Sequence, residues 1–466
     1  MRRKIYFAKV VLSLCTLGII LTSCEKEQVN ETLDTNSMQL EEPPFKNYMV
    51  ISADSEMTKS VENYIKTGGG EILSTIPEIG IAVVSSKDAN FIQNTLKNKE
   101  IVSVIPDYEI KWIPSGPTEM ANPPSIGDTE FFYNKGYLWG LDAINAPEAW
   151  NAGYTGEGAT VFILDSGIDA ENIEFTQNLN TQLSTSFVPG EGYNIRPGKY
   201  FNHGTHVAGT IAAAQNGRGI IGVAPEANIV AVKVLSELTG SGAFSTINAG
   251  IVYAGLKEAD VINMSLGATL YKNGKLVDAD GNPFKIPGKY VMEIVLAQQR
   301  AIDYAYKKGT TIIASAGNDA HDADGDGSWI KLPGGLNNVI TVSATAPENY
   351  NLDPSANFNY DIPASYTNYG KSLIDIAAPG GDGDYSILDY ILSTGSDGAY
   401  YFAGGTSMAA PHVSGVAALI IAKNGGQMDP HSVAKQLGNT ADKIDGNGQS
   451  VYFGKGRVNA LRAVTE

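Results

Sequence analysis

Four near-continuous apolar runs constrain the fold of this chain more than any other sequence feature. They span residues 159–164, 229–234, 261–266 and 310–316. Helical patterns stand between them, for example at 244–257 and 291–307. Strands without a polar face are typical of parallel sheets that are covered on both sides. The pattern therefore predicts an α/β fold, with a mostly parallel sheet and helices on both faces.

Residues 45–110 predict a separate, smaller domain. Apolar strand patterns lie at 48–51, 71–76, 79–84 and 101–105, with two amphipathic helical segments among them. The resulting order βαββαβ is that of a ferredoxin-like α+β domain. The segment contains no histidine or cysteine, so taken alone it indicates a small binding or chaperoning module.

The N-terminus predicts export. Three basic residues at 2–4 precede an apolar stretch at 5–21, and small residues then lead to Cys24. This is the order of a cleavable signal peptide covering residues 1–24. A transmembrane anchor fits less well, because Lys9 interrupts the apolar stretch. The polar residues 25–44 predict a flexible tether.

The charge and cysteine counts argue against two classes of function. Carboxylates outnumber lysine plus arginine by 50 to 33. Nucleic-acid binding is therefore not expected, since it needs a basic surface. The 2 cysteines are Cys15 and Cys24, so the rest of the chain can form neither a disulfide framework nor a thiolate metal site.

Polar residues at the ends of the predicted elements point to catalysis. Asp165 follows the first apolar run, Asn318 follows the last, and His203 opens an apolar helical stretch. Ser407 stands at the start of a helix rich in small residues. Each residue alone is most simply a cap or turn residue. Together they supply an orienting carboxylate, a base, a nucleophile and an oxyanion donor, in the order Asp, His, Ser of one serine-protease arrangement.

His203 and His206 also suggest a metal site. The zinc helix signature spaces its histidines four residues apart with a glutamate between them. These two are three residues apart and have no neighbouring carboxylate, so a catalytic base at His203 is favoured. His206 and His412 are flanked by small apolar residues, and we expect both to be buried and structural.

Three motifs resemble those of the subtilisin-like serine proteases. They are Asp165-Ser166-Gly167, His203-Gly204-Thr205-His206-Val207-Ala208-Gly209 and Gly405-Thr406-Ser407-Met408-Ala409-Ala410-Pro411. The resemblance covers residues 138–463 and includes 260–267 and 452–459. It implies a serine endopeptidase made as a zymogen, with a catalytic domain at 136–466 and an inhibitory prodomain at 45–110. The exposed linker at 111–135 would hold the maturation site.

The same resemblance implies how a polypeptide substrate is bound. Two segments resemble the walls of the primary specificity pocket, which receives the side chain on the acyl side of the scissile bond: Ser265-Leu266-Gly267 and Ser315-Ala316-Gly317. Gly242 lies in a segment similar to the edge strand that pairs with the substrate backbone, and Phe244 would border a second pocket. A preference for apolar side chains is expected. In this family the threonine at position 406 also lies close to the oxyanion hole.

A structural Ca²⁺ site is implied as well. Its ligands would be the side chains of Glu174 and Asn216 and the backbone carbonyls of Ala214, Arg218 and Ile220, and oxygen ligands suit this hard cation. The family has an aspartate where this chain has Glu174.

The end of the signal peptide resembles a bacterial lipobox, Leu21-Thr22-Ser23-Cys24. A lipid on Cys24 would then be the membrane attachment of the precursor, and cleavage in the linker would release the protease. The alternative function is a non-enzymatic surface lipoprotein that binds peptides through a protease-like domain.

Two polar stretches, 268–290 and 319–335, are inserted into the α/β pattern and predict surface loops. The second begins like an EF-hand calcium loop. Pro333 stands where that loop needs a bidentate glutamate, which excludes an EF-hand.

Overall fold

The computed structural model describes residues 47–113, 117–121, 130–353, 356–383, 386–446 and 448–466. The predicted signal peptide, the tether and the lipid attachment at Cys24 lie outside these residues. Within the described ranges, no helix is both long enough and apolar enough to cross a membrane.

The N-terminal unit has the predicted βαββαβ order. Its strands are β1 (Asn47–Ser52), β2 (Gly70–Ile76), β3 (Ile81–Ser86) and β4 (Ile101–Pro106). They pair antiparallel in the order β2-β3-β1-β4. The helices α1 (Lys59–Thr67) and α2 (Phe91–Thr95) contribute Val61, Ile65 and Phe91 to one small core with the sheet. The ferredoxin-like prediction is therefore confirmed.

The larger sheet is mostly parallel, as predicted. Its path is β18-β17-β15-β11-β7-β9-β8, and β19 also pairs with β17. All pairs are parallel except β17 with β18. The strands are β7 (Thr160–Asp165), β8 (Thr185–Ser186), β9 (Asn228–Lys233), β11 (Val261–Met264), β15 (Thr311–Ser315), β17 (Ile340–Ala346), β18 (Ile362–Pro363) and β19 (Ile376–Pro379).

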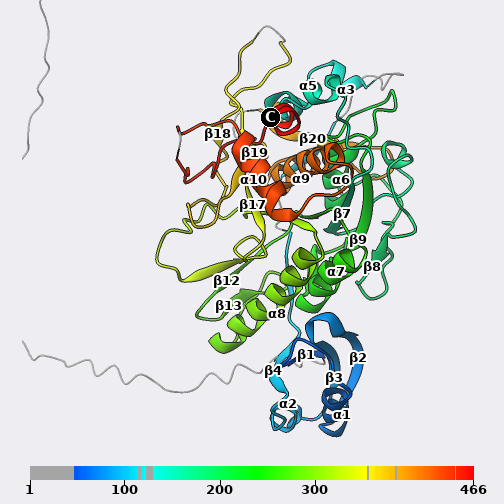
Figure 1. Ribbon diagram of the computed structural model, residues 1–466, viewed down its shortest axis with the longest axis vertical. Coiled ribbons are helices and arrows are strands. Elements are labelled where there is room, and N and C mark those ends of the chain that lie inside the picture. Colours follow the sequence, from blue (N-terminus) through cyan, green and yellow to red (C-terminus); the bar gives the residue numbers. More distant parts are fainter. Residues whose placement is uncertain (1–46, 114–116, 122–129, 354–355, 384–385, 447) are drawn as a thin grey trace, which may run out of the picture. The chain divides into compact units, whose positions relative to one another are not determined.

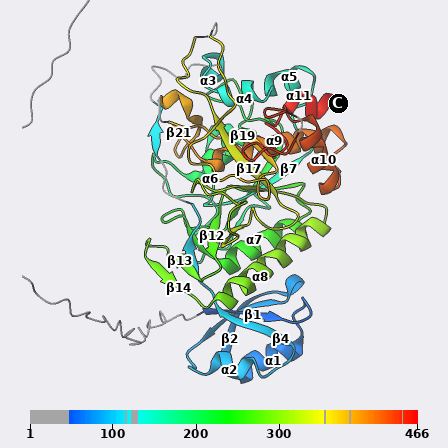
Figure 2. The same cartoon turned by 90° about the vertical axis from the view of Figure 1, so that its left-hand side faces the viewer.

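Alternate side chains of the central strands enter two different cores. In β7, Val161 and Ile163 belong to the core that includes α6 (His203–Ala212) and α9 (Thr406–Lys423). Phe162 and Leu164 belong to the core that includes α7 (Phe244–Leu256) and α8 (Gly288–Lys307). The sheet lies between these two helical layers (Figure 1, Figure 2). Burial on both faces explains why successive residues of β7 are apolar.

The remaining elements are short and surround these layers. They are the helices α3 (Phe131–Asn134), α4 (Trp139–Ala143), α5 (Ala146–Asn151), α10 (Pro430–Thr440) and α11 (Ala460–Thr465), the 3-10 helices η1 (Pro77–Ile79), η2 (Ile173–Phe175) and η3 (Ile387–Asp389), and the strands β5 (Glu109–Lys111), β6 (Thr118–Met120), β10 (Ser241–Ala243), β20 (Ile391–Thr394) and β21 (Tyr400–Ala403).

The prediction of two surface loops is wrong for part of each. β12 (Ala268–Tyr271) pairs with β16 (Trp329–Leu332), and β13 (Lys275–Val277) pairs with β14 (Pro283–Lys285), both antiparallel. Leu270, Leu276 and Ile286 are buried and anchor these strands in the core beside α8. Single apolar residues separated by polar turns gave too weak a signal to predict strands. We call residues 268–290 the insertion hairpin.

Close packing of α9 depends on Gly415. A β-carbon at this position would lie 2.5 Å from the β-carbon of Val223, which is fully buried. Gly438 in α10 is also helical, but a β-carbon there would meet only the Lys455 side chain, at 3.2 Å. The two glycines therefore differ in packing while sharing the same backbone conformation.

We predict that Gly415→Ala lowers the free energy of unfolding by about 1 to 3 kcal/mol, because overpacking outweighs the gain in helix propensity. Gly438→Ala is the matched control and should leave stability unchanged or raise it by up to about 1 kcal/mol. Denaturant unfolding followed by circular dichroism measures both, in a Ser407→Ala background that removes the predicted nucleophile. Equal effects of the two substitutions would contradict this packing account.

Candidate active site

The carboxyl end of β7 brings Asp165 to the start of α6. The Nδ1 atom of His203 lies 2.9 Å from both carboxylate oxygens of Asp165. Asp165 also accepts a hydrogen bond from the Ser166 backbone N–H, at 2.7 Å. Asp165 is 1% exposed and His203 is 8% exposed. This contact directs the Nδ1–H toward the carboxylate and leaves Nε2 as the basic nitrogen.

A glycine and a helix cap make this contact geometrically possible. A β-carbon on Gly204 would lie 2.2 Å from the Gly167 carbonyl oxygen and 3.1 Å from the Asp165 β-carbon. A side chain at Gly204 would therefore push α6 away from β7. Asn202 caps α6, since its Oδ1 accepts a hydrogen bond from the Thr205 N–H at 2.8 Å. His203 is thus fixed as the first residue of a capped helix.

Ser407 is the second residue of α9 and is buried. Its hydroxyl donates to the Ser265 carbonyl at 3.1 Å, and the Ser265 hydroxyl donates to the Ser407 carbonyl at 2.7 Å. The described side chains of Ser407 and His203 form no hydrogen bond with each other in this state. Rotation about the Cα–Cβ bond redirects the Ser407 hydroxyl, and catalytic contacts often tighten only when substrate binds.

Asn318 and Thr406 form one hydrogen-bonded unit next to Ser407. The Asn318 Oδ1 atom accepts from the Thr406 N–H at 3.0 Å and from the Thr406 hydroxyl at 2.7 Å. The Thr406 hydroxyl in turn accepts from the Gly317 N–H, at 3.0 Å. Both hydrogen bonds hold the amide by its oxygen, so Nδ2 is the end that can donate elsewhere. The sequence placed Thr406 near this site but gave no sign that it orients Asn318.

Three neighbouring strands place these groups at one edge of the sheet. β7 ends at Asp165, β11 runs into Ser265, and β15 runs into Asn318. β11 lies between the other two, and all three are parallel. The carboxyl edge of a parallel sheet is where α/β proteins form their active sites. The four predicted catalytic residues are therefore brought to the same edge.

The other two histidines in sequence motifs are buried, as predicted. Nε2 of His206 lies 2.9 Å from the Tyr401 carbonyl oxygen, and Nδ1 of His412 lies 2.8 Å from the Met408 carbonyl oxygen. Burial lowers the pKa of His206 to about 3 and that of His412 to about 4. Both imidazoles are therefore neutral at physiological pH and serve as core side chains.

The end of the predicted prodomain and the start of the predicted linker pair with two other strands. β5 pairs antiparallel with β10, so that Ile110 lies opposite Gly242. β6 pairs antiparallel with β21, so that Thr118 lies opposite Ala403. β10 is the predicted substrate-binding edge, and β21 leads through two glycines to Thr406. The chain thus supplies an added strand to β10 and another to β21.

Trp112 corrects the prediction that this linker is exposed. The residue has no exposed surface, and its indole N–H donates to the Gly242 carbonyl at 2.9 Å. Its ring lies 5.1 Å from that of Phe244 at an interplanar angle of 71°, and its carbonyl accepts from the Gly267 N–H at 3.0 Å. The linker is buried here because its aromatic side chain packs against Phe244.

The insertion hairpin contacts the same segment from another side. Ile110 forms an antiparallel bridge with Asp278, and the rings of Tyr108 and Phe284 lie 5.6 Å apart. Tyr108, Ile110 and Trp112 are all buried. The alternate residues of this segment therefore share one buried face, as in a strand enclosed on that side.

The predicted calcium ligands gather around Glu174, which is fully buried. Its carboxylate accepts from the Tyr400 hydroxyl at 2.5 Å and from the Asn216 side-chain amide at 3.1 Å. Burial raises the pKa of Glu174 to about 7. The Oδ1 atom of Asn216 is buried without a hydrogen-bond partner. The Ala214 N–H donates to the Glu174 carbonyl at 3.0 Å, which ties the two segments together.

Glu130 is a further acidic group at this site that the sequence did not single out. Its Oε1 accepts from the Gly217 N–H at 2.6 Å, and its charge adds to the rise in the pKa of Glu174. Within the described ranges, no group of three or more His, Cys, Asp or Glu side chains forms a metal cluster. A cation here would therefore depend on these two carboxylates, Asn216 and backbone carbonyls.

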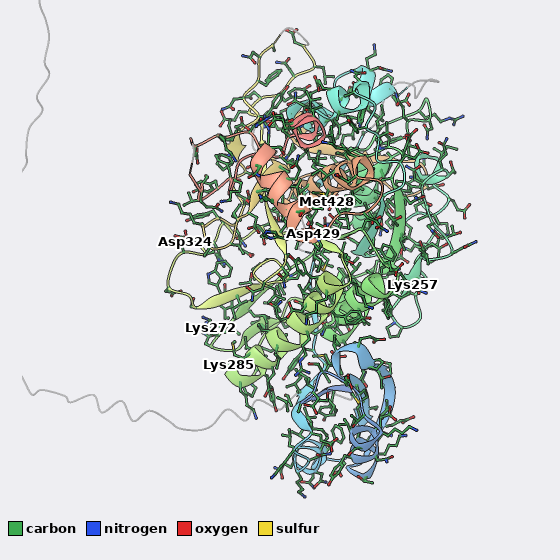
Figure 3. All side chains as sticks on the ribbon, viewed as in Figure 1. Lys257, Lys272, Lys285, Asp324, Met428 and Asp429 are labelled. Carbon is green, nitrogen blue, oxygen red and sulfur yellow. The ribbon has the colours of Figure 1, made fainter. Side chains whose placement is uncertain are left out.

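The acidic stretch 319–335 accepts hydrogen bonds from the backbone of another loop. Asp324 (Figure 3) accepts hydrogen bonds from the Lys371 and Ser372 N–H groups, at 2.7 and 2.8 Å. Hydrogen bonds from Ser372 lower the pKa of Asp324. These contacts hold Asp324 against residues 371–372.

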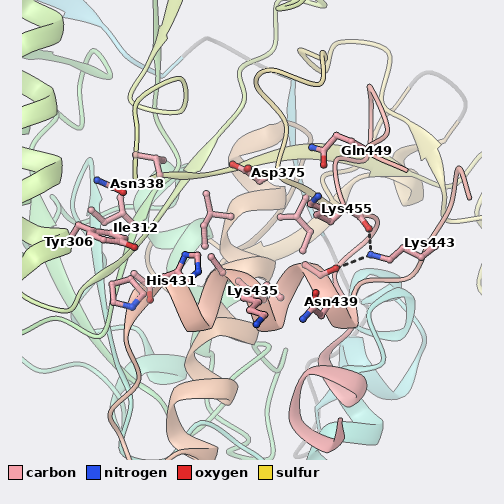
Figure 4. A pocket seen from close by; sticks show the side chains of 18 of the residues that line it. Tyr306, Ile312, Asn338, Asp375, His431, Lys435, Asn439, Lys443, Gln449 and Lys455 are labelled. Atoms are coloured by element: carbon pink, nitrogen blue, oxygen red, sulfur yellow. Dashed lines mark hydrogen bonds between the residues drawn. The ribbon is translucent and has the colours of Figure 1, made fainter. Parts of the chain in front are cut away.

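A cavity of about 710 Å³ lies between α10 and the loops that carry Asn338 and Lys455 (Figure 4). Apolar side chains such as Ile312 line it together with Lys435 and Lys443. None of the four predicted catalytic residues lines this cavity, so it is separate from the edge of the sheet described above.

Comparisons with known proteins agree with this geometry. Residues 156–456 match the subtilase family. Subtilisin NAT from Bacillus subtilis subsp. natto is 35% identical over 350 residues, which cover 74% of this chain and 77% of the relative. Thermitase from Thermoactinomyces vulgaris is 34% identical over 330 residues, which cover 70% of this chain and 95% of thermitase.

A solved structure shares the fold. The epidermin leader peptide processing serine protease from Staphylococcus aureus superposes with a TM-score of 0.70 at 23% identity, covering 90% of this chain and 99% of that one. This structural likeness shows the fold alone, whereas the family match and the relatives identify the family. The chain belongs to the subtilase family and is a serine endopeptidase.

Proposed function

We propose that the protein is an exported serine endopeptidase, made as a zymogen, which cleaves polypeptides through Asp165, His203 and Ser407. The contact of His203 Nδ1 with both oxygens of Asp165, at 2.9 Å, carries the proposal. A buried imidazole oriented in this way offers Nε2 as a general base. Membership of the subtilase family supports the same assignment.

In the proposed reaction, Ser407 Oγ attacks the substrate carbonyl carbon while His203 Nε2 takes the hydroxyl proton. The tetrahedral intermediate collapses to an acyl-enzyme, and His203 returns the proton to the leaving amine. Water then attacks the acyl carbonyl with His203 again as the base, which releases the acid product and restores Ser407. Asp165 keeps Nδ1 protonated and stabilises the imidazolium.

The oxyanion would be held by Asn318 Nδ2 and the Ser407 backbone N–H. Thr406 supports this role, because its N–H and hydroxyl bind Asn318 through the amide oxygen. The donor end of the amide is then ready before the charge develops, which is how such groups stabilise the transition state. Thr406 is a positioning residue for Asn318 in this scheme.

We infer that the N-terminal unit is an inhibitory prodomain. Its contacts with the rest of the chain support this: Arg300 of α8 donates to the Ser52 carbonyl at 2.9 Å, and Asp107 accepts from the Ser245 N–H at the start of α7, at 3.2 Å. A carboxylate is favourable at that end of a helix. The strands β5 and β6 add to β10 and β21, as an extended substrate would.

This pairing narrows the proposed maturation site. We propose that the scissile bond lies between the two paired stretches, β5 and β6. The cleaved bond would then lie between Ile113 and Pro117, within the proposed linker at 111–135. The catalytic domain at 136–466 and a short N-terminal extension would remain after cleavage.

Substrates would bind as extended polypeptides. The proposed contacts are backbone pairing with Gly242, an apolar pocket at Phe244, and a primary pocket between the segments 265–267 and 315–317. Ser265 lies against Ser407 through reciprocal hydrogen bonds, which supports its place beside the reacting bond. The insertion hairpin would enclose residues further toward the substrate's N-terminus.

We also propose a structural Ca²⁺ ion bound by Glu174, Asn216 and the carbonyls of Ala214, Arg218 and Ile220. The buried, partnerless Asn216 Oδ1 and the raised pKa of Glu174 fit such a cation. Glu130 is suited to be an additional ligand. The ion would stabilise the loop 214–220 and take no part in the chemistry.

The proposed cellular form follows from the N-terminal sequence. Residues 1–24 would direct export, and a lipid on Cys24 would tether the precursor to the cell envelope. Cleavage between Ile113 and Pro117 would separate the catalytic domain from that lipid. No other membrane attachment and no nucleic-acid partner are proposed.

Ser407→Ala is predicted to leave the full-length chain unprocessed and to lower kcat for peptide hydrolysis by about 10⁶, as loss of the nucleophile does in subtilisin. Asn318→Ala should lower kcat by about 10²- to 10³-fold with little change in KM, because it acts on the transition state. Thr406→Val should lower kcat less than Asn318→Ala, and Thr406→Ser should restore it. Electrophoresis and peptide kinetics measure these effects. A Ser407→Ala protein that still processes itself would show the mechanism to be wrong.

N-terminal sequencing of the mature protein is predicted to find a first residue between positions 114 and 117. Fractionation of the producing cells should recover the mature form in the soluble fraction. The unprocessed Ser407→Ala chain should be recovered in the membrane fraction. A mature form that stays in the membrane fraction would contradict release. A first residue beyond position 121 would contradict the assignment of the bond between β5 and β6.

Chelation with EDTA is predicted to lower the Tm, and added Ca²⁺ should restore it. Glu174→Gln should abolish the response to Ca²⁺, whereas Glu157→Gln, an exposed glutamate, should keep it. The response should be smaller at pH 6 than at pH 8, because protons compete for Glu174, whose pKa is raised to about 7. Differential scanning fluorimetry measures these shifts. An undiminished response in Glu174→Gln would remove this residue from the site.

A further inference from the structure

Lys331 places an ammonium group between the two proposed walls of the primary pocket. A β-carbon on Gly317 would lie 2.4 Å from the Lys331 Nζ atom, and one on Gly267 would lie 3.5 Å from it. These two glycines end the segments 315–317 and 265–267. Lys331 belongs to β16 and is 5% exposed. The positive charge therefore lies inside the protein, against both segments that flank the proposed pocket.

The partners of this ammonium within the chain are distant. Nζ lies 3.3 Å from the Thr269 hydroxyl oxygen and 3.5 Å from Asp319 Oδ2. Charge-assisted hydrogen bonds are normally about 2.7 to 2.9 Å, and an ammonium has three donors to satisfy. The Asp319 side chain is 43% exposed, so solvent competes for its carboxylate.

Burial makes such an arrangement costly. It lowers the pKa of Lys331, and the nearby charge of Asp319 only partly opposes this effect. A buried cation is stable only when it is paired. A second carboxylate that reached Nζ at a shorter distance would therefore stabilise the pocket, and an apolar side chain would leave the ammonium poorly paired.

We propose that Lys331 selects substrates with aspartate or glutamate on the acyl side of the scissile bond. The substrate carboxylate would enter between the two walls and accept a hydrogen bond from Nζ, while Asp319 turns toward solvent. The inference rests on the proposed function, because that function defines which side chain enters this pocket. It replaces, for this pocket alone, the apolar preference implied by the family resemblance.

The glycine walls are consistent with this role. Gly317 has a φ of +98°, a conformation that favours glycine, and a side chain there would collide with the ammonium. At Gly267 a β-carbon would lie 2.9 Å from the Lys331 Cε atom. The missing side chains at both glycines therefore leave space that the Lys331 side chain occupies.

The chain's own segment lacks the selected group. Residues 113–116 are isoleucine, proline, serine and glycine, so none of them can pair with Lys331. Strand pairing of β5 and β6 would hold the segment in place without this interaction. We therefore expect the maturation bond to be cleaved more slowly than a bond that follows an acidic residue. Slow cleavage suits a segment that also inhibits the enzyme.

Peptides that differ only in the acyl-side residue test the proposal. With the self-processed enzyme, kcat/KM is measured for glutamate, glutamine, methionine and alanine at that position. We expect glutamate to exceed glutamine by roughly 10- to 100-fold, the factor that a charge-assisted hydrogen bond supplies. Lys331→Met should remove this difference. Asp319→Asn should enlarge it, because the competing carboxylate is gone.

Lys272→Met is the matched control, since Lys272 is an exposed lysine on the insertion hairpin (Figure 3). It makes the same change of charge outside the pocket and should keep the ratio of glutamate to glutamine. An equal ratio in the wild type and Lys331→Met would overturn the proposal. A preference for alanine with no effect of charge would show that Lys331 only fills the pocket.

If Lys331→Met does not fold, Asp319→Asn is the second test. Lys331 is intact in this variant, so the ratio of kcat/KM for glutamate over glutamine must rise. A ratio that falls or stays constant in Asp319→Asn would overturn the proposal. Absence of Ser407-dependent cleavage of every peptide is a different result, which would contradict the proposed function itself.

Discussion

Burial of the central sheet on both faces is the constraint on which the rest of this structure depends. Val161 and Phe162, neighbours in β7, enter opposite cores. A polar side chain inside the sheet therefore needs a buried partner, as Asn263 has in Ser265 and Ser414. The candidate catalytic side chains stand instead where strands end. The parallel order of β15, β11 and β7 brings three such ends together, and Asn318, Ser265 and Asp165 meet there with the first turns of α6 and α9.

Strand pairing underlies the proposed inhibition. β10 and β21 each carry an added strand from the N-terminal part of the chain, namely β5 and β6. Backbone pairing supplies affinity without a strict sequence, while the buried Trp112 ring beside Phe244 adds a specific contact. Inhibition and substrate binding would then use the same physical interaction, and cleavage would convert one into the other.

Much of this could be predicted from the sequence, and the exceptions have physical causes. Asp165, His203, Asn318 and Ser407 could be predicted as catalytic candidates because each stands at the boundary of a strongly periodic segment. Lys331, Glu130 and the orienting role of Thr406 were not found, because each depends on a contact between residues far apart in the chain. Trp112 was assigned to an exposed linker, because local composition cannot show which distant residues a side chain will pack against.

Labelling with a fluorophosphonate tests the central claim most directly, because the reagent reacts with a serine only when a base and an oxyanion site activate it. The account predicts that the self-processed protein is labelled once and that peptide mass spectrometry places the label on Ser407. Labelling should be lost in His203→Ala although Ser407 is still present. Absence of labelling in the processed protein, or a label on another residue, would contradict the account and favour a domain that only binds peptides.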